Sequence, residues 1–259
     1  AFDQPDWLDD ASAAFTFVRD NMTRGNRLGH SWRAGGLLFP GLALDFAAMI
    51  RAGLALYEAT GEGAYLAQAL SWQTALDAHH ADTEHGGYYL TADDAEGLII
   101  RPHATVDDAI HNGLIVQNLI RLAVLTGDHR WLQKADAMFN AILPRTGDNL
   151  FGHLSLLNAL DMRLTAAEIV VTGEGPQADA LLKAARALPH ANRIVLHAAK
   201  ADALNAEHPA RAKLDAAHGA AAFVCRGQTC SLPVTEPDAL KKMVSDANAD
   251  TIIFQTAIC

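Results

Sequence analysis

The sequence predicts a mainly α-helical protein of stacked helical hairpins, followed by a small α/β unit. Three observations carry this prediction. Apolar residues recur at helical spacing up to about residue 162, and a block of residues in this part recurs further along the chain. After residue 162, short β-branched runs alternate with a helical stretch, which is typical of strand, helix and strand.

Composition restricts the class of protein. The 259 residues are 50% hydrophobic and carry a formal net charge of -10. This apolar content suffices for a substantial core, and acidic residues spread along the chain disfavour nucleic acid or a membrane as partner. No leader-like segment or run of about 18 apolar residues occurs. Three cysteines are too few for a disulfide framework, so we expect a cytoplasmic protein.

Six helices are expected in the first part of the chain. The first is amphipathic and is followed by a loop. The second carries only Asp45 and Arg51 as charges and is therefore expected to be buried nearly all round, up to Thr60-Gly61. Between the third and fourth, two β-prone runs around an acidic turn predict a β-hairpin. The helices are expected at 6–22, 42–57, 64–79, 107–125, 130–142 and 150–162, and the hairpin strands at 88–90 and 98–100.

The internal repeat defines how the helices stack. Leu56, Thr60-Gly61 and Tyr65-Leu66 recur 66 residues later, as Leu122, Thr126-Gly127 and Trp131-Leu132. One buried helix, a tight Thr-Gly turn, one amphipathic helix and a long return loop form each repeat. Such hairpins must pack side by side, in an open solenoid or a closed ring. The short turns then lie on one side and the long loops on the other.

The last third of the chain is expected to form a separate unit. Strands at 168–173, 193–197 and 221–225, with a helix at 178–188, predict a mainly parallel sheet, and a last helix is expected from 238 to about 247. We therefore divide the chain into a helical segment, 1–165, and an α/β appendage, 166–259.

The long-loop side is the candidate site. Asp45, shifted by the repeat length, coincides with His111, so both lie in first turns of equivalent helices. A carboxylate and a histidine at a helix-end cavity suit proton transfer, which makes Asp45, His111 and Asp108 candidate catalytic residues. Aromatic rings with bidentate polar groups suit a polyhydroxylated ligand. The candidate substrate-binding residues are His30, Trp32, Arg33, Tyr88, Asp94 and Arg101.

Structural roles remain open for the same residues. Asp45 and Asp108 are well placed to cap helices, and His111 to bond Asp107 four residues before it. Arg101 is equally suited to pairing across the hairpin, and the aromatic residues to packing. We expect no metal and no cofactor. Cys225 and Cys230 have neither thioredoxin nor zinc spacing and are expected to be structural.

Two sequence blocks resemble a known family. The block Gly86-Gly87-Tyr88-Tyr89 to Ala92-Asp93-Asp94-Ala95-Glu96 and the block Val224-Cys225-Arg226-Gly227 to Cys230 are similar to the thioredoxin-domain-containing YyaL family, related to spermatogenesis-associated protein. The resemblance implies a partial (α/α) toroid, similar to N-acylglucosamine 2-epimerases and six-hairpin glycosidases. It also implies a preceding thioredoxin-like domain, so this chain is expected to correspond to the C-terminal portion of a longer protein.

The sequence is compatible with two functions. The first is binding or conversion of a sugar or sugar-like metabolite, by an isomerase or hydrolase acting through general acid/base catalysis. The second is a non-catalytic interaction scaffold for the thioredoxin-like redox domain. Because six helices supply about half a ring, we expect a second copy of the chain or a preceding segment to cover the open flank.

Overall fold

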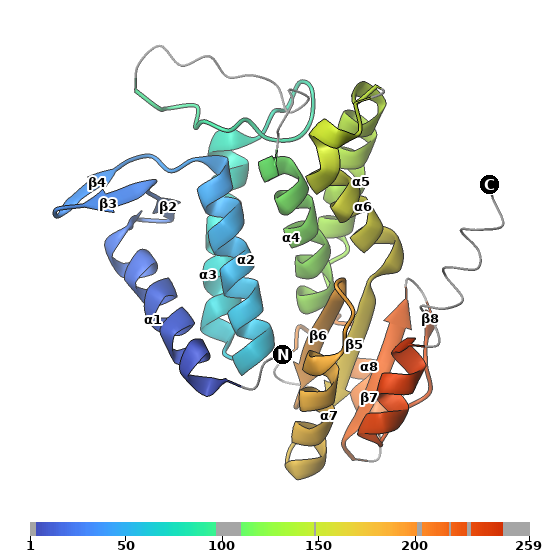
Figure 1. Cartoon of the computed structure of the whole chain (residues 1–259). Helices are drawn as coiled ribbons and strands as arrows, with labels where there is room; N and C mark the ends of the chain where they lie inside the picture. Colours follow the sequence, from blue (N-terminus) through green and yellow to red (C-terminus); the bar gives the residue numbers. More distant parts are fainter. Residues whose placement is uncertain are drawn as a thin grey trace. The chain divides into compact units, whose positions relative to one another are not determined.

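The computed structural model describes residues 4–96, 110–147, 149–200, 204–217, 219–226 and 229–245. These residues form two compact units, shown in Figure 1. The helical unit comprises Gln4–Ala123 and His129–Arg163, and the α/β unit comprises Val124–Asp128 and the chain from Leu164. No helix in the described ranges is long and apolar enough to cross a membrane.

The helical unit begins with helix α1 and two small β-ribbons. The helix, Pro5–Asn21, starts at a proline that suits the first helical position. Two antiparallel ribbons follow, where the sequence predicts a loop. The sequence does not indicate them because strands of two or three residues are too short to show an alternation of apolar and polar side chains. Their strands are β1 (Thr23–Arg24), β2 (Arg27–Leu28), β3 (Ser31–Arg33) and β4 (Gly36–Leu38).

Helices α2 (Ala43–Thr60) and α3 (Gly63–His80) form the first hairpin. Gly61 ends α2 with φ of 78°, a left-handed conformation that favours glycine. The hydroxyl of Thr60 accepts a hydrogen bond from the Glu62 N–H, 3.1 Å away. Thr126 accepts the equivalent bond from Asp128, at 3.2 Å, so the repeated Thr-Gly turn has the same bonding in both places.

Helices α4 (Ile110–Thr126), α5 (Arg130–Ile142) and α6 (Leu154–Thr165) continue the array. Figure 1 shows α2 and α4 neighbouring each other, with α3 and α5 behind them. The 3-10 turns η1 (Leu143–Arg145) and η2 (Phe151–His153) lie between α5 and α6. The prediction of stacked helical hairpins with a small α/β unit is therefore confirmed, and the helical unit is a partial (α/α) toroid.

Helix α2 is not buried all round, contrary to the prediction. Its core side carries Phe46, Ile50 and Leu54, which are at most 1% exposed. Leu44 and Ala48 are exposed on another side, because no described element packs over that stripe. Apolar composition alone does not distinguish a helix with one open apolar stripe from a fully buried one.

The α/β unit contains a four-stranded sheet in the order β6-β5-β7-β8. Strand β5 (Ala167–Thr172) pairs parallel with β6 (Arg193–Ala198) and antiparallel with β7 (Ala221–Arg226), which pairs antiparallel with β8 (Thr229–Cys230). The expected mainly parallel sheet is therefore wrong. Helix α7 (Pro176–Ala187) makes the crossover that the parallel pairing of β5 and β6 needs. Between β6 and β7, the described residues contain one short helix, α8 (Arg211–Ala216).

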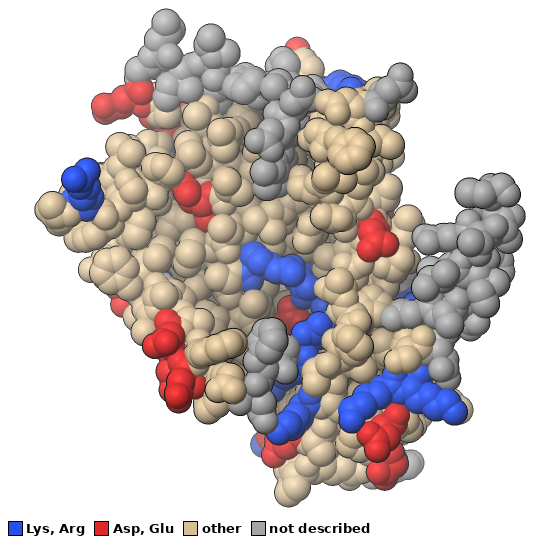
Figure 2. Space-filling model, viewed as in Figure 1, with Lys and Arg blue, Asp and Glu red and all other residues tan. Residues whose placement is uncertain are grey.

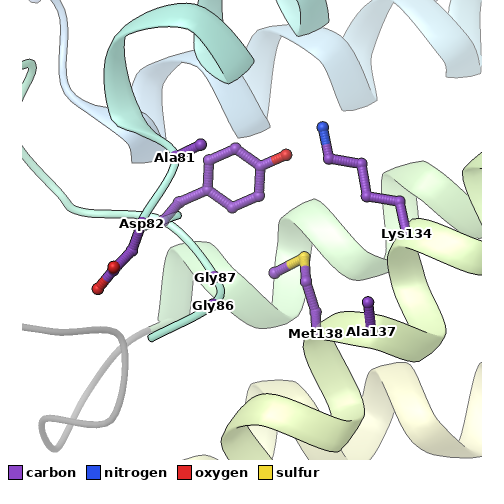
Figure 3. A pocket seen from close by; sticks show the side chains of 8 residues that line it. Ala81, Asp82, Gly86, Gly87, Lys134, Ala137 and Met138 are labelled. Atoms are coloured by element: carbon purple, nitrogen blue, oxygen red, sulfur yellow. The ribbon is translucent and has the colours of Figure 1, made fainter. Parts of the chain in front are cut away.

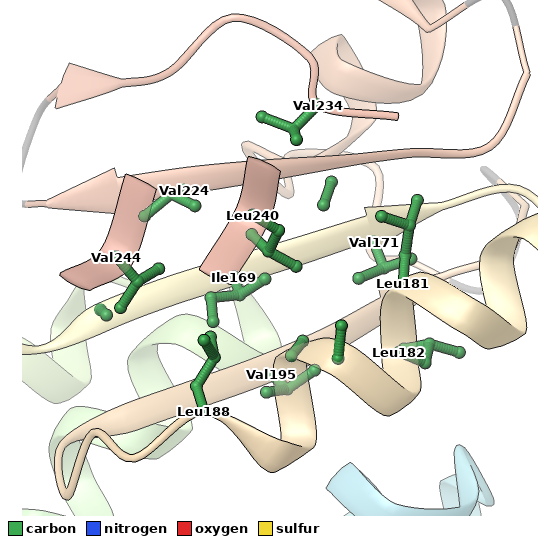
Figure 4. Close-up of a cluster of buried hydrophobic side chains, with 14 residues drawn as sticks. Ile169, Val171, Leu181, Leu182, Leu188, Val195, Val224, Val234, Leu240 and Val244 are labelled. Atoms are coloured by element: carbon green, nitrogen blue, oxygen red, sulfur yellow. The ribbon is translucent and has the colours of Figure 1, made fainter. Parts of the chain in front are cut away.

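A core of its own holds this unit together. Figure 4 shows Leu181 and Leu182 of α7 packed with Ile169 and Val171 of β5 and with Val195 of β6. Residues 237–245 are helical and add Leu240 and Val244 to the same cluster. All these side chains are at most 5% exposed.

A disulfide joins two directly facing residues of this sheet. Cys225 of β7 and Cys230 of β8 are register partners with a Cα–Cα distance of 4.0 Å, and their sulfurs are bonded. The two cysteines are only five residues apart because β8 follows β7 closely along the chain. The spacings typical of redox and zinc motifs therefore do not predict this disulfide.

Candidate functional site

The candidate site lies at one end of the α2–α3 hairpin, where α2 begins and α3 ends. Backbone hydrogen bonds tie the segment after α3 to both helices: Ala43 N–H donates to Leu90, and Tyr89 N–H to His80, each at 2.8 Å. Residues 88–90 therefore do not form the expected strand. Their backbone groups bond helix ends, and within the described part of the chain Tyr88 forms only an isolated bridge with Ala81. The expected partner strand, 98–100, lies outside the described residues.

Asp45 and His30 form a pair at the start of α2. The Asp45 carboxylate accepts the Leu42 N–H at 2.7 Å, so it does cap the helix. The same oxygen lies 2.8 Å from His30 Nδ1. The side chain of His30 is 40% exposed and that of Asp45 25%. When the imidazole is neutral, the carboxylate favours the tautomer with hydrogen on Nδ1, which leaves the Nε2 lone pair open.

Asp94 is held by Arg27 of β2. The two side chains form a bidentate ion pair, with Arg27 Nη2 2.7 Å from Asp94 Oδ1. Hydrogen bonding to this guanidinium lowers the pKa of Asp94 to about 2. Asp94 therefore stays ionised at every physiological pH, and it suits holding a ligand hydroxyl rather than moving a proton.

His79 and Asp93 form a third pair beside it. His79 Nδ1 lies 2.9 Å from Asp93 Oδ1, and the Asp93 N–H donates to the His79 carbonyl at 2.9 Å. One ligand atom each of His79, Asp93 and Asp94 lies within 4.8 Å of the others, which is close enough for a metal. However, Arg27 occupies both oxygens of Asp94 and already balances its charge. We call the residues of the three pairs the loop-end cluster: Arg27, His30, Asp45, His79, Asp93 and Asp94.

The side chains of His111 and Asn112 form hydrogen bonds with the backbone of Tyr88 and, in the part of the chain that the structure describes, do not line an open cavity, contrary to the prediction for His111. The Asn112 side chain accepts the Tyr88 N–H at 2.9 Å and donates to its carbonyl at 3.1 Å. His111 Nε2 lies 2.9 Å from the same carbonyl and donates to it. Burial lowers the pKa of His111 and keeps it neutral. This arrangement holds the Gly86–Tyr88 turn against α4, and no described contact joins His111 to Asp45.

Tyr88 faces a separate cavity of about 170 Å³, shown in Figure 3. Tyr88 is 1% exposed, so its ring is not an open sugar platform at the loop end. Its hydroxyl donates to Asp77 at 2.5 Å, and Lys134 Nζ lies 2.5 Å from the same oxygen. Burial raises the pKa of Tyr88 well above its ordinary value. Lys134 and Met138 of α5 point into this mostly apolar cavity.

The remaining predicted residues have mixed outcomes. Trp32 of β3 is 39% exposed and meets Phe17 of α1 edge-on, with ring centroids 6.4 Å apart. Arg33 is exposed at the end of the same strand. Arg101 and Asp108 lie outside the described residues.

Sequence reasoning missed Arg27, His79 and Asn112 as site residues. Arg27 lies three residues before His30 in the same loop, and this is a usable signal once that loop is considered as a whole. The pairing of Arg27 with Asp94 spans 67 residues and depends on the tertiary fold.

Similar solved structures are family 76 glycoside hydrolases. One from a bovine Bacteroides thetaiotaomicron strain is 22% identical, with TM-score 0.43, over 52% of this chain and 30% of that chain. A mannosidase and an α-mannanase from Bacteroides thetaiotaomicron are 15% and 13% identical, with TM-scores 0.46 and 0.49. They cover 54% and 62% of this chain, and 38% and 46% of their own lengths. Similarity at this level carries no information on activity.

Curated relatives are more informative about ancestry. No family model matches the sequence. Human spermatogenesis-associated protein 20 is 30% identical over 213 residues, and the rat and mouse proteins are 29% and 28% identical over 214 residues. The match covers 79% of this chain and 27% of each relative, so the chain spans about a quarter of their length. The resemblance to the spermatogenesis-associated protein family is thereby confirmed over four-fifths of the chain.

Proposed function

We propose that the helical unit binds a sugar or sugar-like metabolite at the loop-end cluster and that His30 exchanges a proton with it. The single observation that carries the proposal is the His30–Asp45 pair. A carboxylate fixes one ring nitrogen at 2.8 Å, while the imidazole is 40% exposed and its other nitrogen has no protein partner among the described residues. This is the arrangement that general acid/base catalysis requires.

The rest of the cluster supplies binding groups of the right chemistry. Asp94 is an ionised acceptor fixed by Arg27, and Asp93 is half-exposed beside it. Carboxylates of this kind accept hydrogen bonds from hydroxyl groups. Trp32, on the adjoining ribbon, offers an exposed aromatic surface. In an isomerase step, His30 Nε2 takes a proton from a ligand C–H and returns it to the same carbon, with Asp45 orienting the ring. In a hydrolase step, His30 Nε2 takes the proton of the attacking water and gives it to the leaving oxygen as the bond to that oxygen breaks.

A library of neutral sugars tests binding through thermal stabilisation. A sugar at about 100 times its dissociation constant should add about 2.7 kcal/mol to the free energy of unfolding. Asp94→Asn should weaken this effect, because it removes an ionised acceptor. Turnover of the stabilising sugar should fall in both His30→Gln and Asp45→Asn. The matched control is His129→Gln, which changes an exposed histidine before α5.

Some results would contradict the proposal. Unchanged turnover in His30→Gln would remove the histidine from the mechanism. Absence of stabilisation by every sugar would favour the second candidate, an interaction scaffold for a redox domain. Exposed apolar residues before and within α6 support that alternative: Leu150 is 50%, Phe151 86% and Leu154 52% exposed.

A further inference from the structure

Two arginines lie on neighbouring helices of the helical unit, close enough for the charge of one to act on the other. Arg51 belongs to α2 and Arg121 to α4, and the two helices are joined nearby by the Asn118 amide, which donates to the Ala47 carbonyl at 2.8 Å. Arg121 Nη1 lies 2.7 Å from Glu58 Oε1. The side chains of Arg121 and Glu58 are only 7% and 14% exposed. The charges of Arg121 and Glu58 both act on Arg51, so one carboxylate interacts with two guanidinium groups.

The hydrogen-bonding capacity of these two arginines is only partly used within the described residues. Arg51 Nη1 and Arg121 Nε are both buried, and neither has a hydrogen-bond partner. Leaving a buried charged donor unpaired is costly, and an extra buried positive charge increases that cost. The pKa of Arg51 is lowered to about 10, first by burial and then by the charge of Arg121. Among the described residues, no group donates or accepts a hydrogen bond at these two nitrogens, and Glu58 is the carboxylate that acts on both guanidinium groups.

The surface beside Arg51 is open. Residues at i−3, i, i+4 and i+7 share one side of a helix, and here they are Ala48, Arg51, Ala55 and Glu58 of α2. Ala48 and Ala55 are exposed and Arg51 is half-buried. In Figure 2 the upper part of the face over α2 and α4 is mostly uncharged, and basic side chains lie together with an acidic one lower on the same face. The small alanine side chains on either side of Arg51 leave part of its guanidinium stem uncovered, although Nη1 itself is buried.

We propose that Arg51 and Arg121 bind the oxyanion of a small ligand, the carboxylate or phosphate of an acidic sugar. The planar guanidinium groups match the two oxygens of such an anion, and an anion supplies the missing negative charge. The sugar part of this inference rests on the proposed function; the anion part does not. A ligand that satisfies both sites is a uronate or a sugar phosphate.

The test compares four probes at equal ionic strength: glucose, glucuronate, glucose 6-phosphate and inorganic phosphate. Their dissociation constants are measured by thermal shift for the wild type, Arg51→Met, Arg51→Lys and Arg19→Met. Arg51→Met should weaken binding of the anionic probes by about tenfold or more. Arg51→Lys should have an intermediate effect, because lysine keeps the positive charge but cannot donate two parallel hydrogen bonds to one anion. Arg19→Met removes the same charge from an exposed ion pair on α1 and should bind anions like the wild type.

Stability without ligand separates a binding role from a structural one. Arg51→Met should leave the melting temperature unchanged or raise it, since it removes an uncompensated buried charge. A clear fall would identify Arg51 as a structural residue and overturn the proposal. If Arg19→Met loses anion binding to the same extent, the loss reflects the net charge of the protein and not a site at Arg51. This result would also overturn the proposal.

The outcomes distinguish the two proposals. If no anionic probe stabilises the wild type, or if Arg51→Met binds anions unchanged, the anion site is wrong whatever glucose does. If inorganic phosphate binds in an Arg51-dependent way and no sugar binds more tightly, the anion site stands and the sugar function fails. Preference for glucuronate or glucose 6-phosphate over both glucose and phosphate supports both proposals and identifies the group that is recognised.

Discussion

At the scale of single residues, the histidines of this chain are in contrasting environments. His30 is 40% exposed and meets a carboxylate, whereas His111 is 8% exposed and bonds a backbone carbonyl. An exposed imidazole with a free nitrogen can exchange a proton with a ligand, and a buried one that donates to a carbonyl cannot do so without breaking that bond. The environments thus favour His30 over His111 as the acid/base residue.

The buried state of His111 predicts an acid sensitivity of folding. Burial lowers its pKa in the folded protein below the ordinary value of about 6.5. The unfolded chain therefore binds the proton more readily, and the contribution of His111 to stability is present above about pH 6.5 and lost as pH falls below it. Urea unfolding of His111→Gln should show a smaller drop in free energy between pH 7.5 and 5.5 than the wild type.

Glutamine keeps an N–H that can reach the Tyr88 carbonyl, so this variant is expected to fold. The exposed His129→Gln is the control and should keep the wild-type difference between the two pH values. Retention of the full difference in His111→Gln would show that other groups cause the acid sensitivity. His208 of the α/β unit is one of them, because burial lowers its pKa too.

At the scale of elements, close helix packing depends on one glycine. Gly113 of α4 approaches the backbone of α6, and a Cβ there would lie 2.5 Å from the Ser155 carbonyl oxygen. Gly113→Ala should therefore lower the free energy of unfolding by about 1–3 kcal/mol through overpacking. Gly63→Ala is the matched control, since nothing lies within 4 Å of its added Cβ and alanine favours the helix.

Both variants can be measured by denaturant unfolding followed by circular dichroism. Equal midpoints for Gly113→Ala and the wild type would mean that α4 and α6 separate at little cost. Gly63→Ala is expected to match or exceed the wild type.

Local signals made most of the helices predictable. Apolar periodicity and the Thr-Gly turns depend on neighbours a few residues apart, and the helix that they predict at 130–142 is observed with these bounds. The β-ribbons at 23–38 are too short to show alternation. The direction of β7 depends on the path of the chain between strands, which no local pattern encodes. In the candidate site, the sequence predicts both His30 and Asp45 as site residues. Their hydrogen bond becomes evident only in the folded structure.

At the scale of the whole molecule, each unit has its own apolar core. In the helical unit, Phe15 meets Tyr65 and Trp72, with both pairs of ring centroids 5.3 Å apart. In the α/β unit, Leu181 and Ile169 lie at the centre of a separate cluster. The proposed sites both belong to the helical unit, so damage confined to the second core should leave ligand binding intact.

Leu181→Ala tests this separation. The side chain is fully buried on α7, and its truncation should cost the α/β unit about 2–5 kcal/mol. Hydrogen exchange should accelerate in β5, β6 and β7, because those strands share the cluster with Leu181, and stay unchanged in α2 and α3. Leu232→Ala, which alters an 83% exposed leucine of the same unit, should leave exchange unchanged throughout. Acceleration that reaches α2 and α3 would instead show that the two cores unfold as one, and the helical unit would then depend on the α/β unit for its stability.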